Sequence, residues 1–234
     1  MAELVQLRLE YEVPELEEMK RVGLFSLSEI RKIVKKREAF EYKLRRNKKR
    51  KEDFLQYIKF EMALLMLISK KRERLMIESK KKEIDNAIAQ KVNRLFKRAI
   101  SYFPEDEKLW LDQIQYCIKM KWHDSVNALY TRMLQVHSRS PELWVMAAKW
   151  EIEDNNSPEN ARKLLQRAVL MNPKSELIWR EYFRMELMYI DLIQKRREVL
   201  QLHKMKDLET NEHDAVLDGS IVNVVYENAV EAIE

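Results

Sequence analysis

A unit of about 34 residues recurs along the chain, and it limits the possible folds more than any other feature. Its clearest copy covers 144–173 and joins two amphipathic segments, the first with large aromatic residues and the second with small ones. Trp110 and Trp179 take the place of Trp144 at shifts of 34 and 35 residues. A period of this size is typical of stacked helix pairs. The residues that define the unit are Phe54, Glu61, Trp110, Tyr116, Trp144, Trp150, Glu151, Ala161, Arg167, Trp179 and Glu186.

The composition favours helix almost everywhere. The 234 residues include only two glycines and five prolines, so the turn residues that hairpins need are scarce. We therefore predict an all-α fold, an α-solenoid of helix pairs preceded by an amino-terminal helical segment. Ser26 and Glu29 form a capping box for a helix that runs to about Leu44, and Gly23 fits the end of the helix before it.

The repeat divides the chain into two predicted regions. Residues 1–50 form the amino-terminal helical segment with a basic end, and 51–234 form an array of about four units. The first unit carries a basic insertion near 68–86, and the fourth is interrupted by a loop near 190–219. The last unit lacks the proline that closes the others, so we expect the array to continue in a longer parent protein.

Three glutamates are predicted to point into the helix stack. At 100° per residue, Glu151 lies within about 20° of Trp144 around its helix, and Glu61 and Glu186 hold the same position in their units. A half-buried carboxylate needs a partner. We expect each to accept hydrogen bonds from a backbone amide or from an arginine of a neighbouring second helix. The candidate arginines are Arg98, Arg132 and Arg167.

Charge is distributed unevenly, although the formal net charge is only +5. Residues 31–51 hold twelve Lys or Arg against two glutamates, whereas 207–234 hold eight acids and no Lys or Arg. The basic run fits either a patch for RNA phosphates or nuclear import, or the solvated outer faces of long helices. The candidate patch residues are Lys43, Arg45, Arg46, Lys48, Lys49, Arg50, Lys51, Lys70, Lys71, Arg72, Arg74, Lys80, Lys81 and Lys82.

Catalytic and metal-binding patterns are missing from the sequence. Neither glycine lies in a phosphate-cradling turn, and the four histidines are too scattered to form a metal site with the single cysteine. Cys117 follows Tyr116 on the apolar side of a helix, where we expect a buried, inert thiol. We therefore expect no enzyme activity, no cofactor, no metal and no small-molecule substrate.

The cellular setting follows from two further observations. A single cysteine fits a reducing compartment. The longest apolar run, 62–68, is far too short to span a bilayer. We expect a soluble intracellular protein without a membrane partner.

The repeat resembles one particular helical-repeat class. Its first helix lacks the glycine of the tetratricopeptide pattern, and its aromatic positions and inward glutamate instead resemble the half-a-tetratricopeptide, or HAT, repeat of RNA-processing assemblies. Across essentially the whole chain, the sequence also resembles the U3 small nucleolar RNA-associated protein 6 family. The stretches that carry this likeness are 21–25, 29–30, 40–44, 51–54, 144–151 and 181–187.

That resemblance implies a non-enzymatic scaffold of the small-subunit processome, in the nucleus and nucleolus, that supports processing of the small-subunit (18S) ribosomal RNA precursor. It implies propeller-containing subunits of the UTP-B subcomplex as partners, and backbone contacts to U3 small nucleolar RNA or precursor ribosomal RNA. The alternative is a HAT-repeat subunit of another RNA-processing complex, such as pre-mRNA splicing or 3′-end cleavage. The two insertions depart from a regular repeat, so their contacts are the least transferable.

Overall fold

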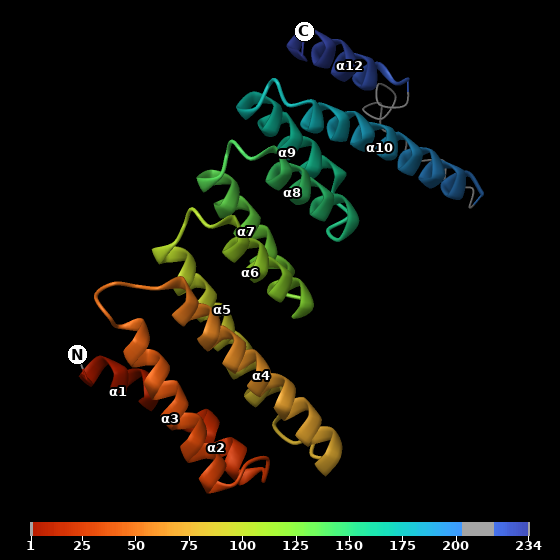
Figure 1. The fold of residues 1–234 in the computed structure, drawn as a ribbon. Helices are drawn as coiled ribbons and strands as arrows, with labels where there is room; N and C mark the ends of the chain where they lie inside the picture. The colour runs from red at the N-terminus through yellow and green to blue at the C-terminus, as the bar shows by residue number, and fades with distance from the viewer. Residues whose placement is uncertain (1, 203–217, 234) are drawn as a thin grey trace. The chain divides into compact units, whose positions relative to one another are not determined.

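The computed structural model describes residues 2–202 and 218–233, and in these ranges every regular element is a helix (Figure 1). The predicted fold class, an all-α solenoid of helix-pair repeats, is confirmed. The chain divides into two compact units, Met1–Val126 and Asn127–Glu234, which are described one at a time.

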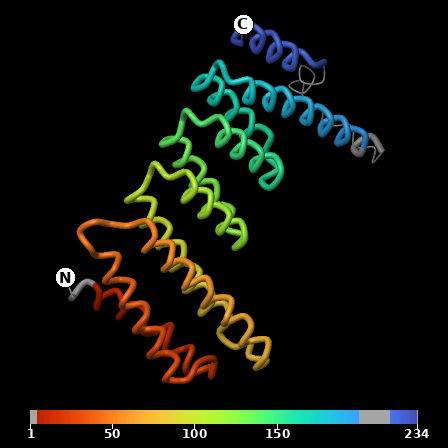
Figure 2. The backbone as a smooth tube through the Cα atoms, in the orientation of Figure 1, coloured from red at the N-terminus to blue at the C-terminus, as the bar shows by residue number. Residues whose placement is uncertain are grey.

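The first unit is a succession of helices packed on their neighbours. Helix α3 contacts α1, α2 and α4, while α5 contacts α4, α2 and α6. Figure 2 shows α4 and α5 running antiparallel along most of their length. The helices are α1 (Ala2–Glu10), α2 (Val13–Arg21), α3 (Leu27–Leu44), α4 (Lys51–Leu75), α5 (Lys81–Tyr102), α6 (Glu107–Lys119) and the start of α7 (His123–Val136).

The predicted end of α2 and start of α3 are confirmed. Gly23 has a φ of +78°, and its amide and that of Leu24 donate to the carbonyls of Lys20 and Met19, the pattern that closes a helix with a left-handed residue. Ser26 and Glu29 then bond each other's backbone amides as a capping box. These local signals fix a tight corner, so that α3 can fold back against α2.

The predicted basic insertion lengthens both helices of its pair. Helix α4 runs to Leu75 and α5 begins at Lys81, so only a short turn separates them. Arg72 is buried and holds this turn, because its Nη1 donates to the carbonyls of Ile77 and Ser79 at 3.2 and 3.0 Å. The arginine supplies donors to turn carbonyls that the helices leave unsatisfied.

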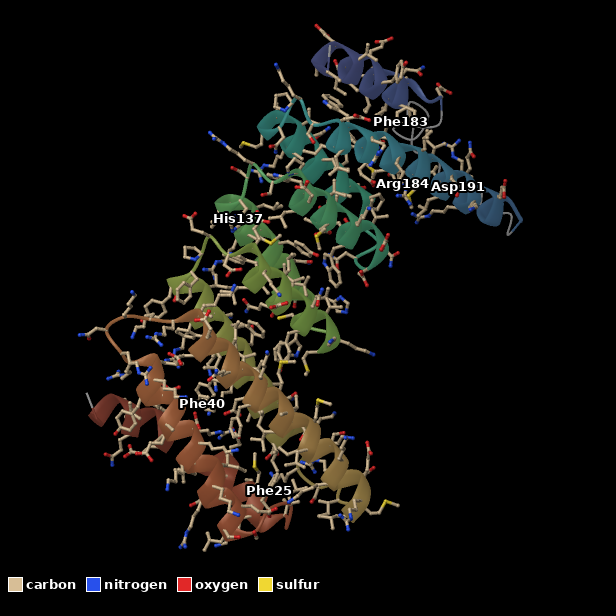
Figure 3. All side chains as sticks on the ribbon, in the orientation of Figure 1. Phe25, Phe40, His137, Phe183, Arg184 and Asp191 are labelled. Carbon is tan, nitrogen blue, oxygen red and sulfur yellow. The ribbon has the colours of Figure 1, made fainter. Side chains whose placement is uncertain are left out.

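An apolar cluster joins α2, α3, α4 and α5 near this turn. Met19, Ile68 and Ile88 are fully buried in it. Farther along the same interface, Phe40 of α3 turns toward α4 (Figure 3) and stacks on Tyr57, with ring centroids 5.0 Å apart. Burial of the apolar stripes of these amphipathic helices is the main stabilising term of the unit.

The second unit repeats the same arrangement. Helix α8 packs on α9 and α10, α9 packs on α10, and α10 packs on α12. Pro141 and Pro158 stand in the first turns of α8 and α9, where their missing amide is not needed. Its helices after α7 are α8 (Pro141–Glu153), α9 (Pro158–Met171), α10 (Glu176–Leu202) and α12 (Ser220–Ile233).

The repeated tryptophan has a specific bonding role in both units. The indole Nε1 of Trp110 donates to the carbonyl of Pro104, six residues earlier, at 2.9 Å. Trp144 does the same with Ser138 at 2.9 Å, and Trp179 with Pro173 at 2.8 Å. The ring therefore fills the helix interface while its N–H satisfies a loop carbonyl. Phe54, which has no such donor, is buried at the equivalent place.

Two predictions for the last repeat are met only in part: the loop near 190–219 and the second-helix pattern after it. The loop predicted near 190–219 is wrong for its first part, because α10 continues to Leu202; its polar composition hid a helix that no glycine or proline interrupts. Residues 203–217 lie outside the described ranges. Helix α12 resumes the second-helix pattern only in part, since Val222 and Val225 are buried but Tyr226 is 61% exposed.

Candidate nucleic-acid interface

A polar contact between successive helix pairs recurs at a separation of 24 residues. In the first unit, Arg37 of α3 donates through Nε and Nη2 to both carboxylate oxygens of Glu61 in α4, each at 2.8 Å. In the second unit, Arg162 of α9 binds Glu186 of α10 in the same two-pronged way, at 2.6 and 2.5 Å. Two parallel charge-assisted hydrogen bonds stabilise the contact between the helices and also fix how the helices are positioned relative to each other.

The same register continues with neutral partners. Cys117 Sγ lies 3.9 Å from the Asn93 side chain, 24 residues earlier. Asn155 bridges the next pair, since its amide donates to Asn127 at 2.9 Å and to Glu151 at 3.1 Å. Where the earlier helix carries asparagine instead of arginine, a hydrogen bond replaces the ion pair.

This register corrects the predicted glutamate partners. Glu61 and Glu186 are buried and paired with arginines as expected. The partner of Glu186 is a second-helix arginine, but it is Arg162 and not the candidate Arg167, and the partner of Glu61 is Arg37 of α3. Arg98 instead binds Glu41 of α3, and Arg167 is exposed. Repeat position favours Arg98 and Arg167, but the contact is made by a different residue of the preceding helix, between one helix pair and the next.

Arg37 is the centre of a buried charge network in the first unit. It is fully buried and also donates to Glu12, the N-cap of α2, and to Glu15 in α2, at 3.1 and 3.2 Å. Lys91 of α5 lies 2.5 Å from Glu12 and 3.3 Å from Glu61. The network thus links α2, α3, α4 and α5.

The pKa shifts in this network follow from burial and from the neighbouring charges. Burial alone would lower the pKa of Arg37, but the charges of Glu61 and Glu15 outweigh it and raise that pKa above its usual value. Burial also raises the pKa of Glu15 and lowers that of Lys91. A buried network of ion pairs of this kind is costly to disrupt and fixes one arrangement of the helices.

The structure separates the two predicted basic runs. Residues 43–51 form the α3–α4 turn, and 70–82 surround the α4–α5 turn at the other end of α4. From Lys51 to Arg72 the helix advances about 32 Å at 1.5 Å per residue. The runs therefore do not form one patch.

Several residues of these runs have structural contacts. Lys49 donates to the Leu44 carbonyl, Lys51 pairs with Asp106, and Lys71 pairs with Glu29 at 2.8 Å. Lys80 pairs with Glu83, Arg72 holds its turn, and Lys43 lies over the Phe40 ring. Arg45 is half-buried. The exposed members are Arg46, Lys48, Arg50, Lys70, Arg74, Lys80, Lys81 and Lys82.

Exposed lysines also lie along the lengths of α3 and α4. We call Lys32, Lys36, Lys59 and Lys70 the α3–α4 basic face; all four are exposed. Lys36 reaches across to the Phe60 ring of α4, 5.5 Å from its centroid, so the outer sides of α3 and α4 adjoin at this point. Lys32 lies one turn from Lys36, and Lys59 and Lys70 are separated by three turns. The α3 lysines belong to the basic run 31–51, whereas Lys59 stands alone in an aromatic segment and gives no such signal in the sequence.

Three further properties of the described residues concern metal ions, the thiol and membranes. No cluster of three His, Cys, Asp or Glu side chains there could hold a metal ion. Burial raises the pKa of the Cys117 thiol to about 11. Among the described helices, none combines the length and apolarity needed to cross a bilayer.

The family model and the similar proteins described below carry the same family name. A family model described as U3 small nucleolar RNA-associated protein 6 matches residues 9–93. The human protein named U3 small nucleolar RNA-associated protein 6 homolog is 40% identical over 235 residues, a match that covers 100% of this chain and 39% of the relative. The mouse homolog is 38% identical with the same coverage, and the Schizosaccharomyces pombe protein is 40% identical over 86% of this chain and 41% of its own length.

The match covers all of this chain but less than half of each mammalian relative. The chain spans about two-fifths of the length of these relatives, and the similarity to the mammalian proteins runs through all of it. The charged pair Arg37–Glu61 lies inside the segment that the family model matches. This chain belongs to the U3 small nucleolar RNA-associated protein 6 family.

Proposed function

We propose that the chain is part of a non-enzymatic scaffold of a nucleolar pre-ribosomal ribonucleoprotein, the small-subunit processome, and supports maturation of the 18S ribosomal RNA precursor. The observation that carries this proposal is the similarity, over the whole chain, to proteins named for their association with U3 small nucleolar RNA. The proposed partners are propeller-containing subunits of UTP-B and U3 small nucleolar RNA or precursor ribosomal RNA.

A scaffold role agrees with how the helices are held. The network around Arg37 ties α2 to α5, and Arg162–Glu186 ties α9 to α10. Such contacts keep a helical-repeat surface in a fixed form, which a protein that positions other subunits requires. Buried polar groups are used here for structure, and the one cysteine is protected.

For the RNA contact we propose the α3–α4 basic face. Lysines on regular helices contact phosphate without reading sequence, so binding should depend steeply on salt. The aromatic rings of the repeat are mostly committed to helix packing, which argues against base stacking as the main mode. Because each single-strand phosphate contact contributes about 0.7 to the salt slope, the variant Lys32→Glu/Lys36→Glu/Lys59→Glu should lower the slope by about 2.

The proposal is tested with the tagged full-length protein expressed in place of the natural one. Affinity purification should enrich U3 small nucleolar RNA and propeller proteins, and depletion should cause unprocessed 18S precursor to accumulate. Enrichment of spliceosomal RNAs or of 3′-end cleavage factors, with normal ribosomal RNA processing, would instead support a different RNA-processing complex.

A further inference from the structure

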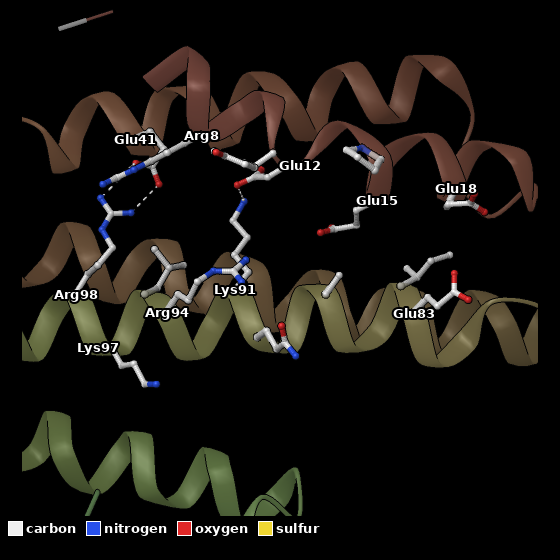
Figure 4. A pocket seen from close by; sticks show the side chains of 16 residues that line it. Arg8, Glu12, Glu15, Glu18, Glu41, Glu83, Lys91, Arg94, Lys97 and Arg98 are labelled. Atoms are coloured by element: carbon white, nitrogen blue, oxygen red, sulfur yellow. Dashed lines mark hydrogen bonds and ion pairs between the residues drawn. The ribbon is translucent and has the colours of Figure 1, made fainter. Parts of the chain in front are cut away.

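The first unit contains a large groove whose two ends carry opposite charge. It lies between α1–α2 on one side and α5 on the other and has a volume of about 830 Å³ (Figure 4). Its floor includes the buried apolar residues Ile84 and Leu95, while Tyr11 at its edge is 79% exposed. An exposed aromatic ring beside an apolar floor is typical of a surface that receives another chain.

One end of the groove is basic. There Arg8 and Arg98 share the single carboxylate of Glu41, each with a bond of 2.9 Å. Arg94 and Lys97 follow on α5 and are exposed. This end of the groove thus carries four cations against one carboxylate, and the positive charge that remains is open to a partner's acids.

The other end is acidic. Figure 4 shows Glu15 and Glu18 of α2 opposite Glu83 of α5. Among the described residues, the half-buried Glu18 pairs with Arg21 and the exposed Glu83 pairs with Lys80, each partner three residues away in sequence. Local pairs whose cation is open to solvent contribute little, so these carboxylates can exchange partners.

The spacing of the two ends matches a helix. Along α5, fourteen residues separate Glu83 from Lys97, which corresponds to about 21 Å and four helical turns. Helices favour acids in the first turn and bases in the last turn because of their dipole. A helix lying antiparallel to α5 would bring its acidic start to Arg94 and Lys97 and its basic end to Glu18 and Glu83.

We propose that this groove binds an amphipathic helix of a partner protein, about fourteen residues long, with acids at its start, an apolar face, and Lys or Arg at its end. The inference rests on the scaffold function proposed above, since it identifies one surface through which a partner subunit attaches. The groove is separate from the α3–α4 basic face, so the protein contact and the RNA contact use different lysines and arginines.

Site-specific photocrosslinking tests this proposal in the full-length protein within its natural complex. p-Benzoylphenylalanine replaces Gln90, which is exposed and lines the groove, and a matched control replaces Gln56, exposed on α4. Position 90 should crosslink to a protein segment that has the acid-to-base order. The double variant Arg94→Glu/Lys97→Glu should reduce that crosslink at least tenfold, and reversing the partner's acids to lysine should restore it.

Other outcomes would overturn the proposal. These are a crosslink to RNA, a crosslink to a segment without acids, a crosslink that survives the double variant, or none above the level at position 56. An unchanged melting temperature of the double variant verifies that it folds. Recovery of U3 small nucleolar RNA from the same extracts separates the two proposals: U3 retained with no groove crosslink rejects the groove and leaves the proposed function standing.

Discussion

Arg37 and Glu61 form a fully buried, two-pronged ion pair between α3 and α4, and the 24 residues that separate them in sequence also separate Arg162 from Glu186. The same polar contact therefore joins successive helix pairs in both units. It means that α3, which precedes the recognisable repeats, meets α4 in the way that the second helix of a repeat meets the next repeat.

Replacing Glu61 with alanine should lower the free energy of unfolding by about 3–5 kcal/mol, because Arg37 would keep its charge in a buried site without its closest partner. Chemical denaturation followed by circular dichroism measures this change. Glu52→Ala, at an exposed position on the same helix, is the matched control and should change stability by less than about 0.5 kcal/mol. A loss below about 1 kcal/mol for Glu61→Ala would show that the pair does not hold the helices.

The corrected partner of Glu186 can be verified with a double-mutant cycle. Arg162→Ala and Glu186→Ala should show a coupling energy of about 1–3 kcal/mol, since the two side chains bond directly. Arg167→Ala, on the same helix but exposed, should show no coupling to Glu186→Ala beyond about 0.5 kcal/mol. Coupling to Arg167 in place of Arg162 would restore the partner predicted from the sequence.

Glu41 makes the first unit sensitive to acid. Burial alone would raise the pKa of Glu41, but its bonds with Arg98 and Arg8 outweigh burial and hold that pKa below the ordinary 4.5. The stability that this carboxylate contributes is therefore complete above pH 4.5 and is lost as the pH falls through the lowered pKa. Glu41→Gln should flatten the decline of stability between about pH 5 and pH 3.

Glu15 supplies the contrasting control for this pH series. Burial raises the pKa of Glu15, so protonation of that side chain favours the folded state, and Glu15→Gln should make the acid decline steeper. Melting temperatures of the three proteins measured from pH 7 to pH 3 check both signs. Parallel curves for all three would contradict the assigned shifts.

Cys117 should resist thiol reagents in the folded protein. Burial raises the pKa of its thiol to about 11, so almost no thiolate is present at pH 8 and the sulfur is also out of reach. Labelling with a chromogenic disulfide should be negligible in native buffer and complete in denaturant. Rapid labelling of the native protein would mean that α6 opens readily or that the thiol is reactive.

The helices themselves could be predicted from the sequence because their signals are local. The capping box at Ser26 and the aromatic period around Trp144 each depend on a few neighbouring residues, and both are present as expected. The sequence prediction ended α10 too early, because a polar stretch resembles a loop unless its helical propensity is considered.

The contacts between helix pairs were harder to predict. The position of Arg162 directly after Ala161 carries no special signal in one sequence, and only the packed structure shows that it meets Glu186. The two basic runs were predicted as one candidate patch, but the 25 residues of α4 place them at opposite ends of that helix. The groove beside α5 combines side chains from α1, α2, α3 and α5, so no linear pattern could reveal it.

The central claim, a scaffold of the U3 ribonucleoprotein that touches RNA through the α3–α4 basic face, is tested most directly by sequencing the RNA crosslinked to the full-length protein by ultraviolet light in cells. We predict that U3 small nucleolar RNA or 18S precursor dominates, and that Lys32→Glu/Lys36→Glu/Lys59→Glu removes most of it while Arg46→Glu/Lys48→Glu/Arg50→Glu, with an equal charge change, does not. Crosslinks mainly to spliceosomal or messenger RNA, or equal crosslinking by both variants, would contradict the account.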